Sequence, residues 1–307
     1  LEKKSWIRNR SGYRRRREGS AWGDLMIAVC PNPYRDTDLK LTVQCVRMLH
    51  SEGFECAVCP VFTSEDWAVP EGFDTTLLQD LTNILPDVSQ ILVLGGDGTI
   101  LAVVRQLKGS EIPILGVNLG TKGFMTALEP DEIHAIPAAL SPDQKISKRM
   151  MLKLSLKRGG EEILFDRALN DIVIHGYGEC IQPTAWADGK KMFSFSGDGL
   201  ILATPTGSTG YSMSAGGPIV EPEARSILLT PICAHTLSAK PFVVSPDKTV
   251  TVLTEKLTGR RAYLAVDGYM VADLESGDLL EVQRAEECVD MIDIGHKSFF
   301  DQLEKLA

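Results

Sequence analysis

The stretch ILVLGGDGTILAVV, residues 91–104, places three glycines and one aspartate between two apolar runs. The first run is typical of a buried strand, and the second, which begins at Thr99, is typical of a helix. Glycine loses the most conformational freedom on folding, so this loop is costly unless something approaches its backbone closely. A strand that turns through glycines into a helix presents N–H groups at a positive helix end, and this geometry binds phosphates.

Asp97 is the unusual residue of the loop. A carboxylate beside a phosphate is repulsive unless it binds a cation or accepts a proton. Both roles occur in phosphoryl transfer, where a kinase aspartate accepts the proton of the attacking hydroxyl. The loop matches neither G-x-x-x-x-G-K-[ST] nor G-x-G-x-x-G. A second interpretation stays open here, namely a tight turn in which Asp97 caps the helix at Thr99.

Strands and helices alternate around this loop. We expect helices at 38–53 and 99–107, and strands at 25–33, 54–62, 91–94 and 112–118. Such alternation predicts a Rossmann-like α/β domain with a parallel sheet. After residue 147 the pattern alternates with period two, and turn signals occur at Gly159-Gly160 and Asp188-Gly189. This second pattern predicts an all-β, sandwich-like domain.

The patterns divide the chain into four segments. We expect a disordered basic tail at 1–23, an α/β domain at 24–146, a β-rich domain at 147–297 and a C-terminal helix at 298–307. A nucleic-acid arm and a targeting segment are the alternative interpretations of the tail.

Composition and charge limit the partners of the chain, which has 307 residues and a net charge of −9. Residues 1–18 contain eight Lys and Arg against two Glu, so the remainder is strongly acidic. We therefore expect neither nucleic acid nor a membrane as the main partner. Cys56 and Cys59 form a C-x-x-C without a second pair, so we interpret them as core residues. The scattered cysteines favour a cytoplasmic location.

The stretch GDGLILATPTGSTGYSMSAGGP, residues 197–218, is the second informative segment. It is dense in Thr, Ser and Gly, and therefore offers many hydroxyl and backbone donors at little steric cost. Tyr211 adds a flat stacking surface. The segment suits a ligand that carries several oxygens and an aromatic ring; the alternative is a polar surface loop.

At these two stretches the sequence resembles the NAD kinase family, which transfers the γ-phosphate of ATP to the 2′-hydroxyl of the adenosine ribose of NAD. The G-G-D-G-T loop alone is weak evidence, because diacylglycerol-type lipid kinases and phosphofructokinases have similar loops. The segment TPTGSTGYSMSAGGP is highly specific. The family motifs stand in order at 95–99, 116–124, 170–171, 204–218 and 231–241.

The resemblance implies a role for each matching residue. Asp97 matches the catalytic aspartate, the proton acceptor for the ribose hydroxyl. The residues that match the loop around the phosphates are Gly95, Gly96, Gly98 and Thr99. The residues that match the dinucleotide site are Phe124, Asn170, Asp171, Asp198, Thr206, Thr209, Gly210, Tyr211, Ser214, Cys233 and Asp267.

The resemblance also implies an assembly and its cofactors. The family fold is an α/β domain that binds nucleotide phosphates, followed by a β-sandwich-like domain that binds the dinucleotide, with the active site between them. Family members are homodimers or homotetramers. They use ATP as phosphoryl donor and need a divalent cation, usually Mg²⁺.

Three positions depart from the family pattern. Asp171 replaces the usual Glu and shortens the carboxylate's reach, Gly210 replaces the usual Ala and removes a methyl group, and Lys122 replaces the usual Leu. These departures bear on nucleotide preference and rate, since small misplacements near a reacting centre lower the rate.

Two further functions remain as alternatives. A lipid kinase of the diacylglycerol or sphingoid type shares the glycine loop, but the acidic body and the hydroxyl-rich 204–217 segment disfavour it. A non-catalytic dinucleotide-binding regulator retains the pocket without the reaction; Asp171 supports it and the intact Asp97 disfavours it.

Overall fold

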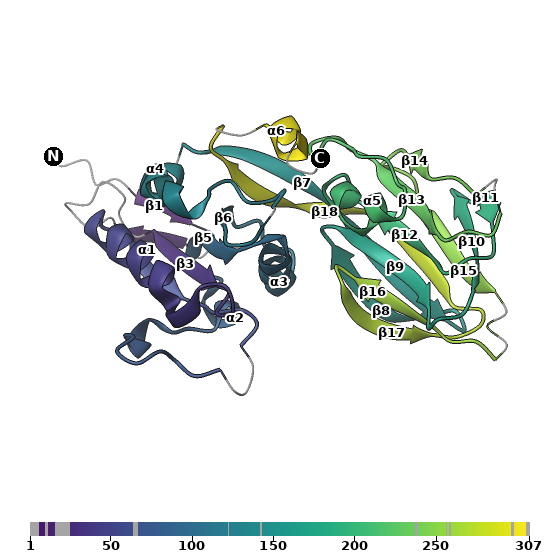
Figure 1. Ribbon diagram of the computed structural model, residues 1–307, viewed down its shortest axis with the longest axis horizontal. Coiled ribbons are helices and arrows are strands. Elements are labelled where there is room, and N and C mark those ends of the chain that lie inside the picture. Colours follow the sequence, from purple (N-terminus) through teal and green to yellow (C-terminus); the bar gives the residue numbers. More distant parts are fainter. Residues whose placement is uncertain are drawn as a thin grey trace. The chain divides into compact units, whose positions relative to one another are not determined.

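The structure is a computed structural model that describes residues 6–9, 12–15, 25–63, 67–121, 123–141, 143–236, 239–255, 257, 259–295 and 298–304. The chain forms two compact units (Figure 1): Leu1–Ser147 together with Val289–Ala307, and Lys148–Cys288. Strands β7 (Lys145–Arg158) and β18 (Leu279–Asp293) contribute residues to both units. The first unit is therefore built from two separate parts of the sequence.

A parallel sheet organises the first unit, in the order β4-β3-β5-β6. The predicted parallel α/β fold is confirmed. The end of β18 lies parallel to β6, with Met291 beside Ile114. The strands are β3 (Met26–Pro31), β4 (Glu55–Val58), β5 (Val88–Gly95) and β6 (Ile114–Asn118).

Helices cover this sheet because their apolar stripes need burial. Helix α1 (Lys40–Ser51) packs against β3 and β4, and α3 (Asp97–Leu107) packs against β5. Cys59 is buried and Cys56 is partly buried against the same core, as core residues would be. The shorter helical segments are η1 (Thr37–Leu39), η2 (Thr75–Leu77), α2 (Leu81–Ile84), η3 (Pro130–Ala135), α4 (Ile136–Ala139) and α6 (Phe299–Glu304).

Two short strands lie within the segment that the sequence predicted to be a disordered tail. Strands β1 (Trp6–Asn9) and β2 (Gly12–Arg15) pair in the antiparallel sense. Their sequences contain Trp, Ile and Tyr, residue types with high strand propensity. The rest of the predicted tail lies outside the described residues.

The second unit is a sandwich of two sheets with antiparallel neighbours, which confirms the predicted all-β fold. One sheet has the order β14-β13-β12-β9-β16-β17. The other contains β11-β10-β15-β18, and β7 joins β18 to β8. Leu152, Ile174 and Val252 come from three of these strands and share one core. The strands not yet bounded are β8 (Glu161–Ala168), β9 (Asp171–Gly176), β10 (Gln182–Ala187), β11 (Lys190–Ser194), β12 (Gly199–Ala203), β13 (Ile227–Ile232), β14 (Phe242–Val244), β15 (Val250–Glu255), β16 (Ala262–Val266) and β17 (Tyr269–Leu274).

Both predicted hairpin turns are present. Gly159 and Gly160 join β7 to β8, and Asp188 and Gly189 join β10 to β11. All four residues have positive φ, which matches the twist of the flanking strands in a two-residue turn.

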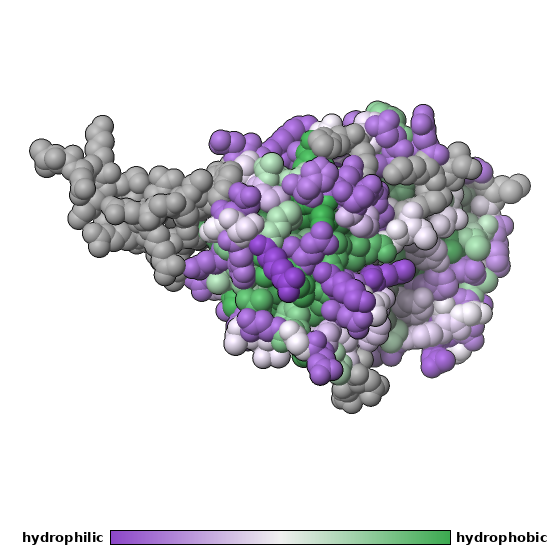
Figure 2. Space-filling view, turned by 60° about the vertical axis from the view of Figure 1, so that its left-hand side comes forward, coloured by the Kyte–Doolittle hydropathy of each residue, from purple (hydrophilic) through white to green (hydrophobic). Residues whose placement is uncertain are grey.

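The molecular surface mixes residue types. On the face shown in Figure 2, hydrophilic residues are interspersed with hydrophobic ones. Exposed large apolar side chains include Ile163 and Phe165 on β8 and Val243 on β14. Among the residues that the structure describes, no helix has the length and apolar character needed to cross a membrane.

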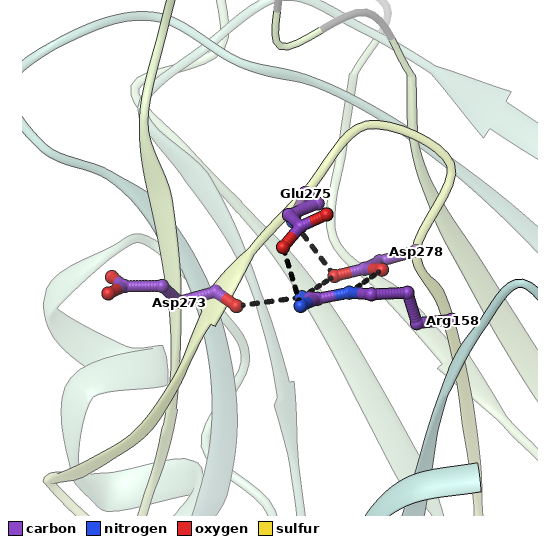
Figure 3. A network of polar contacts seen from close by, with 4 residues as sticks. All are labelled: Arg158, Asp273, Glu275 and Asp278. Atoms are coloured by element: carbon purple, nitrogen blue, oxygen red, sulfur yellow. Dashed lines mark hydrogen bonds and ion pairs between the residues drawn. The ribbon is translucent and has the colours of Figure 1, made fainter. Parts of the chain in front are cut away.

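A guanidinium–carboxylate network fastens the end of β7 to the turn between β17 and β18 (Figure 3). Arg158 donates from Nε to Asp278 Oδ1 at 2.9 Å and from Nη2 to Asp278 Oδ2 at 2.7 Å. Its Nη1 lies 2.7 Å from Glu275 Oε1, and its Nη2 also reaches the Asp273 carbonyl. The Asp278 side chain is only 1% exposed, so Arg158 neutralises a buried charge in bidentate geometry.

We expect Arg158→Ala to lower the free energy of unfolding by about 2 kcal/mol, because it leaves the buried Asp278 carboxylate without its cation. The figure lies below the range for fully buried pairs because the Arg158 side chain is 34% exposed. Urea denaturation measures the loss. The matched control is Lys157→Ala, which breaks a more exposed pair with Glu281. An equal loss in the two variants would contradict the special role of Arg158.

Candidate functional site

The glycine loop lies at the carboxyl end of the parallel sheet. Strand β5 ends at Gly95, and α3 begins at Asp97. The chain passes from β3 outward to β4, and then from β5 to β6 on the other side of β3, so the order reverses between β3 and β5. Open α/β sheets bind ligands at the carboxyl ends of strands where the order reverses. Asn32, which follows β3, reaches across this point and donates from Nδ2 to Thr99 Oγ1 at 3.3 Å.

The glycines of the loop differ in what surrounds them. A Cβ on Gly95 would lie 2.2 Å from Thr99 Oγ1, so the buried Thr99 side chain requires glycine there. A Cβ on Gly96 or on Gly98 would meet nothing within 4 Å. Gly95 therefore serves packing, whereas Gly96 and Gly98 leave open space at the positive end of α3, where a phosphate group fits.

The Asp97 carboxylate is held by the loop that follows β6. Phe124 N–H donates to Asp97 Oδ2 at 2.9 Å, and Met125 N–H donates to Asp97 Oδ1 at 3.0 Å. Gly96 is the N-cap residue, and Asp97 is the first residue of α3. The structure thus favours an oriented carboxylate over the helix cap considered in the sequence. Lys122, in the same loop, lies outside the described residues.

In the second unit, the Asp267 carboxylate holds the loop before β9. Asp267 Oδ2 accepts from Leu169 N–H at 2.8 Å, and Oδ1 accepts from Asn170 N–H at 2.7 Å and Asp171 N–H at 3.1 Å. In return, Asp267 N–H donates to the Asp171 carbonyl at 2.9 Å. The sequence predicted a ligand contact for Asp267; in the structure its carboxylate oxygens bind the backbone of 169–171.

Thr204 and Gly207 hold the other side of this loop. Thr204 Oγ1 donates to the Leu169 carbonyl at 2.6 Å and accepts from Gly207 N–H at 3.0 Å. A Cβ on Gly207 would lie 2.1 Å from the Asn170 carbonyl oxygen, so only glycine permits this approach. Asn170 Oδ1 and Thr206 Oγ1 are buried without a hydrogen-bond partner in the described part of the chain. Buried polar atoms normally have partners, so both are suited to bind ligand hydroxyl or amine groups.

Two of the departures from the family pattern, Asp171 and Gly210, are neighbours. A Cβ on Gly210 would lie 3.6 Å from Asn170 Nδ2 and 3.9 Å from Asp171 Oδ2. Burial, with a smaller effect of the Asp267 charge, raises the pKa of Asp171 to about 7. Burial raises the pKa of Asp267 to about 6 against the opposing effect of its three backbone hydrogen bonds. Position 210 thus lies close to a buried carboxyl group whose pKa is raised toward neutrality.

Asp198 is the centre of a further group of predicted site residues. Cys180 Sγ lies 4.0 Å from Asp198 Oδ1 and 3.5 Å from His235 Nε2. A hydrogen bond to Asp198 raises the pKa of the exposed Cys233 thiol. Tyr211 begins α5 (Tyr211–Ser214), is partly exposed, and has a pKa raised by burial and by nearby groups that include Asp198.

The remaining predicted residues are Thr209, which precedes α5, and Ser214, which ends it. Thr209 donates to the Thr206 carbonyl at 3.4 Å, and Ser214 N–H donates to the Gly210 carbonyl at 3.4 Å. Within the ranges that the structure describes, no group of three or more His, Cys, Asp or Glu residues could hold a metal ion.

Sequence reasoning missed Asn32, Met125 and Thr204. Asn32 follows a strand beside β5, so its position at the carboxyl edge of the sheet could have marked it as a site residue. The backbone N–H of Met125 leaves no sequence signal. Thr204 opens the hydroxyl-rich segment, but nothing in its spacing marks it as a partner of the Leu169 carbonyl.

Two family models match the chain in order. Residues 27–144 match the ATP-NAD kinase N-terminal domain, and residues 169–294 match the ATP-NAD kinase C-terminal domain. An NAD kinase of Geotalea daltonii is 41% identical over 216 residues, which are 69% of this chain and 76% of that protein. An NAD kinase of Lachnoclostridium phytofermentans is 35% identical over 285 residues, which are 90% of this chain and 96% of that protein.

Solved structures with similar folds include two kinases. Yeast NADH kinase complexed with NADH has a TM-score of 0.79 and 25% identity, and the alignment covers 92% of this chain and 87% of that chain. An NAD kinase from Archaeoglobus fulgidus in complex with ATP has a TM-score of 0.70 and 26% identity, with 92% and 98% covered.

We expect Gly95→Ala to destabilise the protein by about 1–3 kcal/mol, because its Cβ overlaps the buried Thr99 side chain. The matched variant is Gly98→Ala, which has open space and a helical position that favours alanine. Its melting temperature should be at or above the wild-type value, and it should bind ATP more weakly, because the methyl group occupies the space left for phosphate. Thermal unfolding and calorimetric titration with ATP measure both effects. Unchanged ATP affinity in Gly98→Ala would contradict this placement.

In the wild type, we expect the free energy of unfolding to fall as the pH rises from about 4 to about 7. We expect Asp171→Asn to make this fall smaller. The folded protein holds a proton on Asp171, with a pKa of about 7, which the unfolded chain releases at its ordinary value of 3.8. Raising the pH through this window therefore favours the unfolded state.

Urea denaturation at several pH values measures the slope for Asp171→Asn. The matched control is Asp188→Asn: a hydrogen bond from Lys248 lowers the pKa of Asp188, so its effect falls below about pH 4. A wild-type slope in Asp171→Asn would show that Asp171 is ionised throughout the window.

Proposed function

The chain belongs to the ATP-NAD kinase family, and from this premise we propose that it transfers the γ-phosphoryl group of ATP to the 2′-hydroxyl of the adenosine ribose of NAD. The order of the two family models along one chain, with G-G-D-G-T inside the first, is the observation that carries the proposal. The similar yeast kinase is complexed with NADH and the similar archaeal kinase with ATP, which supports these substrate classes.

We assign the phosphate groups of ATP to the glycine loop. Gly96 and Gly98 leave space beside the N-terminus of α3, and Thr99 is held in place by Asn32. Backbone N–H groups and the helix dipole stabilise negative charge there. We propose that ATP enters as its complex with a divalent cation, Mg²⁺, since the ion offsets the charge that develops during phosphoryl transfer.

We assign proton acceptance to Asp97. The N–H groups of Phe124 and Met125 fix the direction of its carboxylate. Asp97 takes the proton of the 2′-hydroxyl as that oxygen bonds to the γ-phosphorus. The bond between the γ-phosphorus and its bridging oxygen breaks, and ADP leaves. Positioning and electrostatics account for most of the rate in this chemistry.

We assign dinucleotide recognition to the cluster in the second unit. Asn170 Oδ1 and Thr206 Oγ1 have no hydrogen-bond partner among the described residues, and Tyr211 supplies an exposed ring for stacking. Nearby residues with hydroxyl or carboxyl groups suit the ribose and base of NAD. They are Asp171, Asp198, Thr209 and Ser214.

We also propose a homodimer or homotetramer located in the cytoplasm. Cys30, Cys45, Cys56, Cys59, Cys180 and Cys233 are free thiols, as expected for a reducing compartment. The family resemblance supports the assembly, and size-exclusion chromatography with light scattering measures it.

We expect Asp97→Asn to lower kcat for NADP formation by about 10²–10⁴-fold, because the amide cannot accept the hydroxyl proton. NADP made from ATP, Mg²⁺ and NAD is measured with a coupled dehydrogenase. The matched control is Asp80→Asn, which makes the same chemical change at an exposed cap of α2. NAD binding without NADP formation in the wild type would favour a regulator. If the wild type showed neither NAD binding nor NADP formation, lipid acceptors would be tested next.

A further inference from the structure

Phe124 makes one contact through its backbone and another through its ring. Its backbone N–H donates to the Asp97 carboxylate at 2.9 Å. Its ring lies against the ring of Phe299 on α6, with centroids 6.4 Å apart and the planes inclined by 55°. The C-terminal helix therefore touches the loop that orients Asp97.

The helix α6 is fixed locally at its start. Ser298 donates from its N–H and its hydroxyl to Asp301 Oδ2, at 2.7 Å and 2.8 Å, and Asp301 N–H donates to Ser298 Oγ at 3.2 Å. This is a capping-box arrangement, which satisfies the free N–H groups of the first turn. Phe299 is consequently presented from a helix with a defined start rather than from a free end.

The two phenylalanines of α6 have different surroundings. Phe299 is half-buried and contacts Phe124, whereas Phe300 is 64% exposed and contacts the ring of Phe299. The described residues of α6 include no buried side chain, so the helix adds little to the core of its unit. Its aromatic contact is instead with Phe124, in the loop whose N–H groups orient Asp97.

We propose that Phe299 is a positioning residue of the phosphoryl-transfer site: its ring fixes Phe124, and through Phe124 the N–H groups that orient the Asp97 carboxylate. The inference rests on the proposed function in that Asp97 is the proton acceptor. Without the Phe299 ring, the 123–126 loop samples other orientations, and the Asp97 carboxylate loses its fixed direction. An aromatic pair contributes modestly, so the effect is a reduction and not a loss of activity.

The experiment compares the wild type with Phe299→Ala, Phe300→Ala and Phe299→Tyr. We expect Phe299→Ala to lower kcat/KM for NAD by about three- to tenfold, in line with the strength of one aromatic contact. Phe300→Ala removes the same ring from the same helix and should retain the wild-type value. Phe299→Tyr keeps the ring and should restore most of the activity.

Hydrogen exchange of the backbone amides of 123–126 gives a readout that does not depend on turnover. Faster exchange there in Phe299→Ala than in Phe300→Ala, at equal melting temperature, supports the positioning role. Equal exchange and equal kcat/KM in these two variants would overturn it. If the wild type makes no NADP, the proposed function fails, and the exchange comparison still decides whether Phe299 holds the loop.

Discussion

Hydrogen bonds from peptide N–H groups to an aspartate carboxylate organise the residues on which the candidate function depends. Asp97 accepts two such bonds from the loop after β6, and Asp267 accepts three from the loop before β9. Bonds to an ionised acceptor are stronger than neutral ones, so each carboxylate fixes a loop that has little regular structure of its own. The two aspartates differ in what remains for chemistry. Asp97 lies between Gly96 and Gly98, where an added Cβ would meet no neighbouring group, whereas the Asp267 carboxylate binds the backbone of 169–171.

The glycines near these carboxylates divide into those that permit packing and those that leave room. Gly95 and Gly207 admit a neighbour that any side chain would displace. A Cβ added to Gly96 or Gly98 would meet no neighbouring group within 4 Å. One loop therefore combines a rigid support with an accessible backbone, as a phosphate site requires. Gly210 belongs closer to the first kind, since a Cβ there would lie 3.3 Å from the Gly207 carbonyl oxygen and within 4 Å of Asn170 and Asp171.

Local sequence patterns predicted the parts of the fold that depend on local physics. The apolar run into Gly95, the helix after it and the hairpin turn at Asp188-Gly189 follow from periodicity and turn chemistry, and all are present. The partners of Asp97 and Asp267 were not predictable in this way, because they are backbone groups far along the chain. Thr204 acts through a similarly distant contact, whereas the position of Asn32 directly after a neighbouring strand was a usable signal.

The first unit is assembled from two separate parts of the sequence, which has a consequence for synthesis on the ribosome. Its sheet is completed at β6 by Met291, and α6 begins at Phe299, although the four parallel strands β3, β4, β5 and β6 are made before residue 119. An N-terminal domain usually folds as soon as it emerges. Here the edge of β6 stays unpaired until Met291 has been translated. Until then the chain carries an unpaired strand edge, a form prone to aggregation.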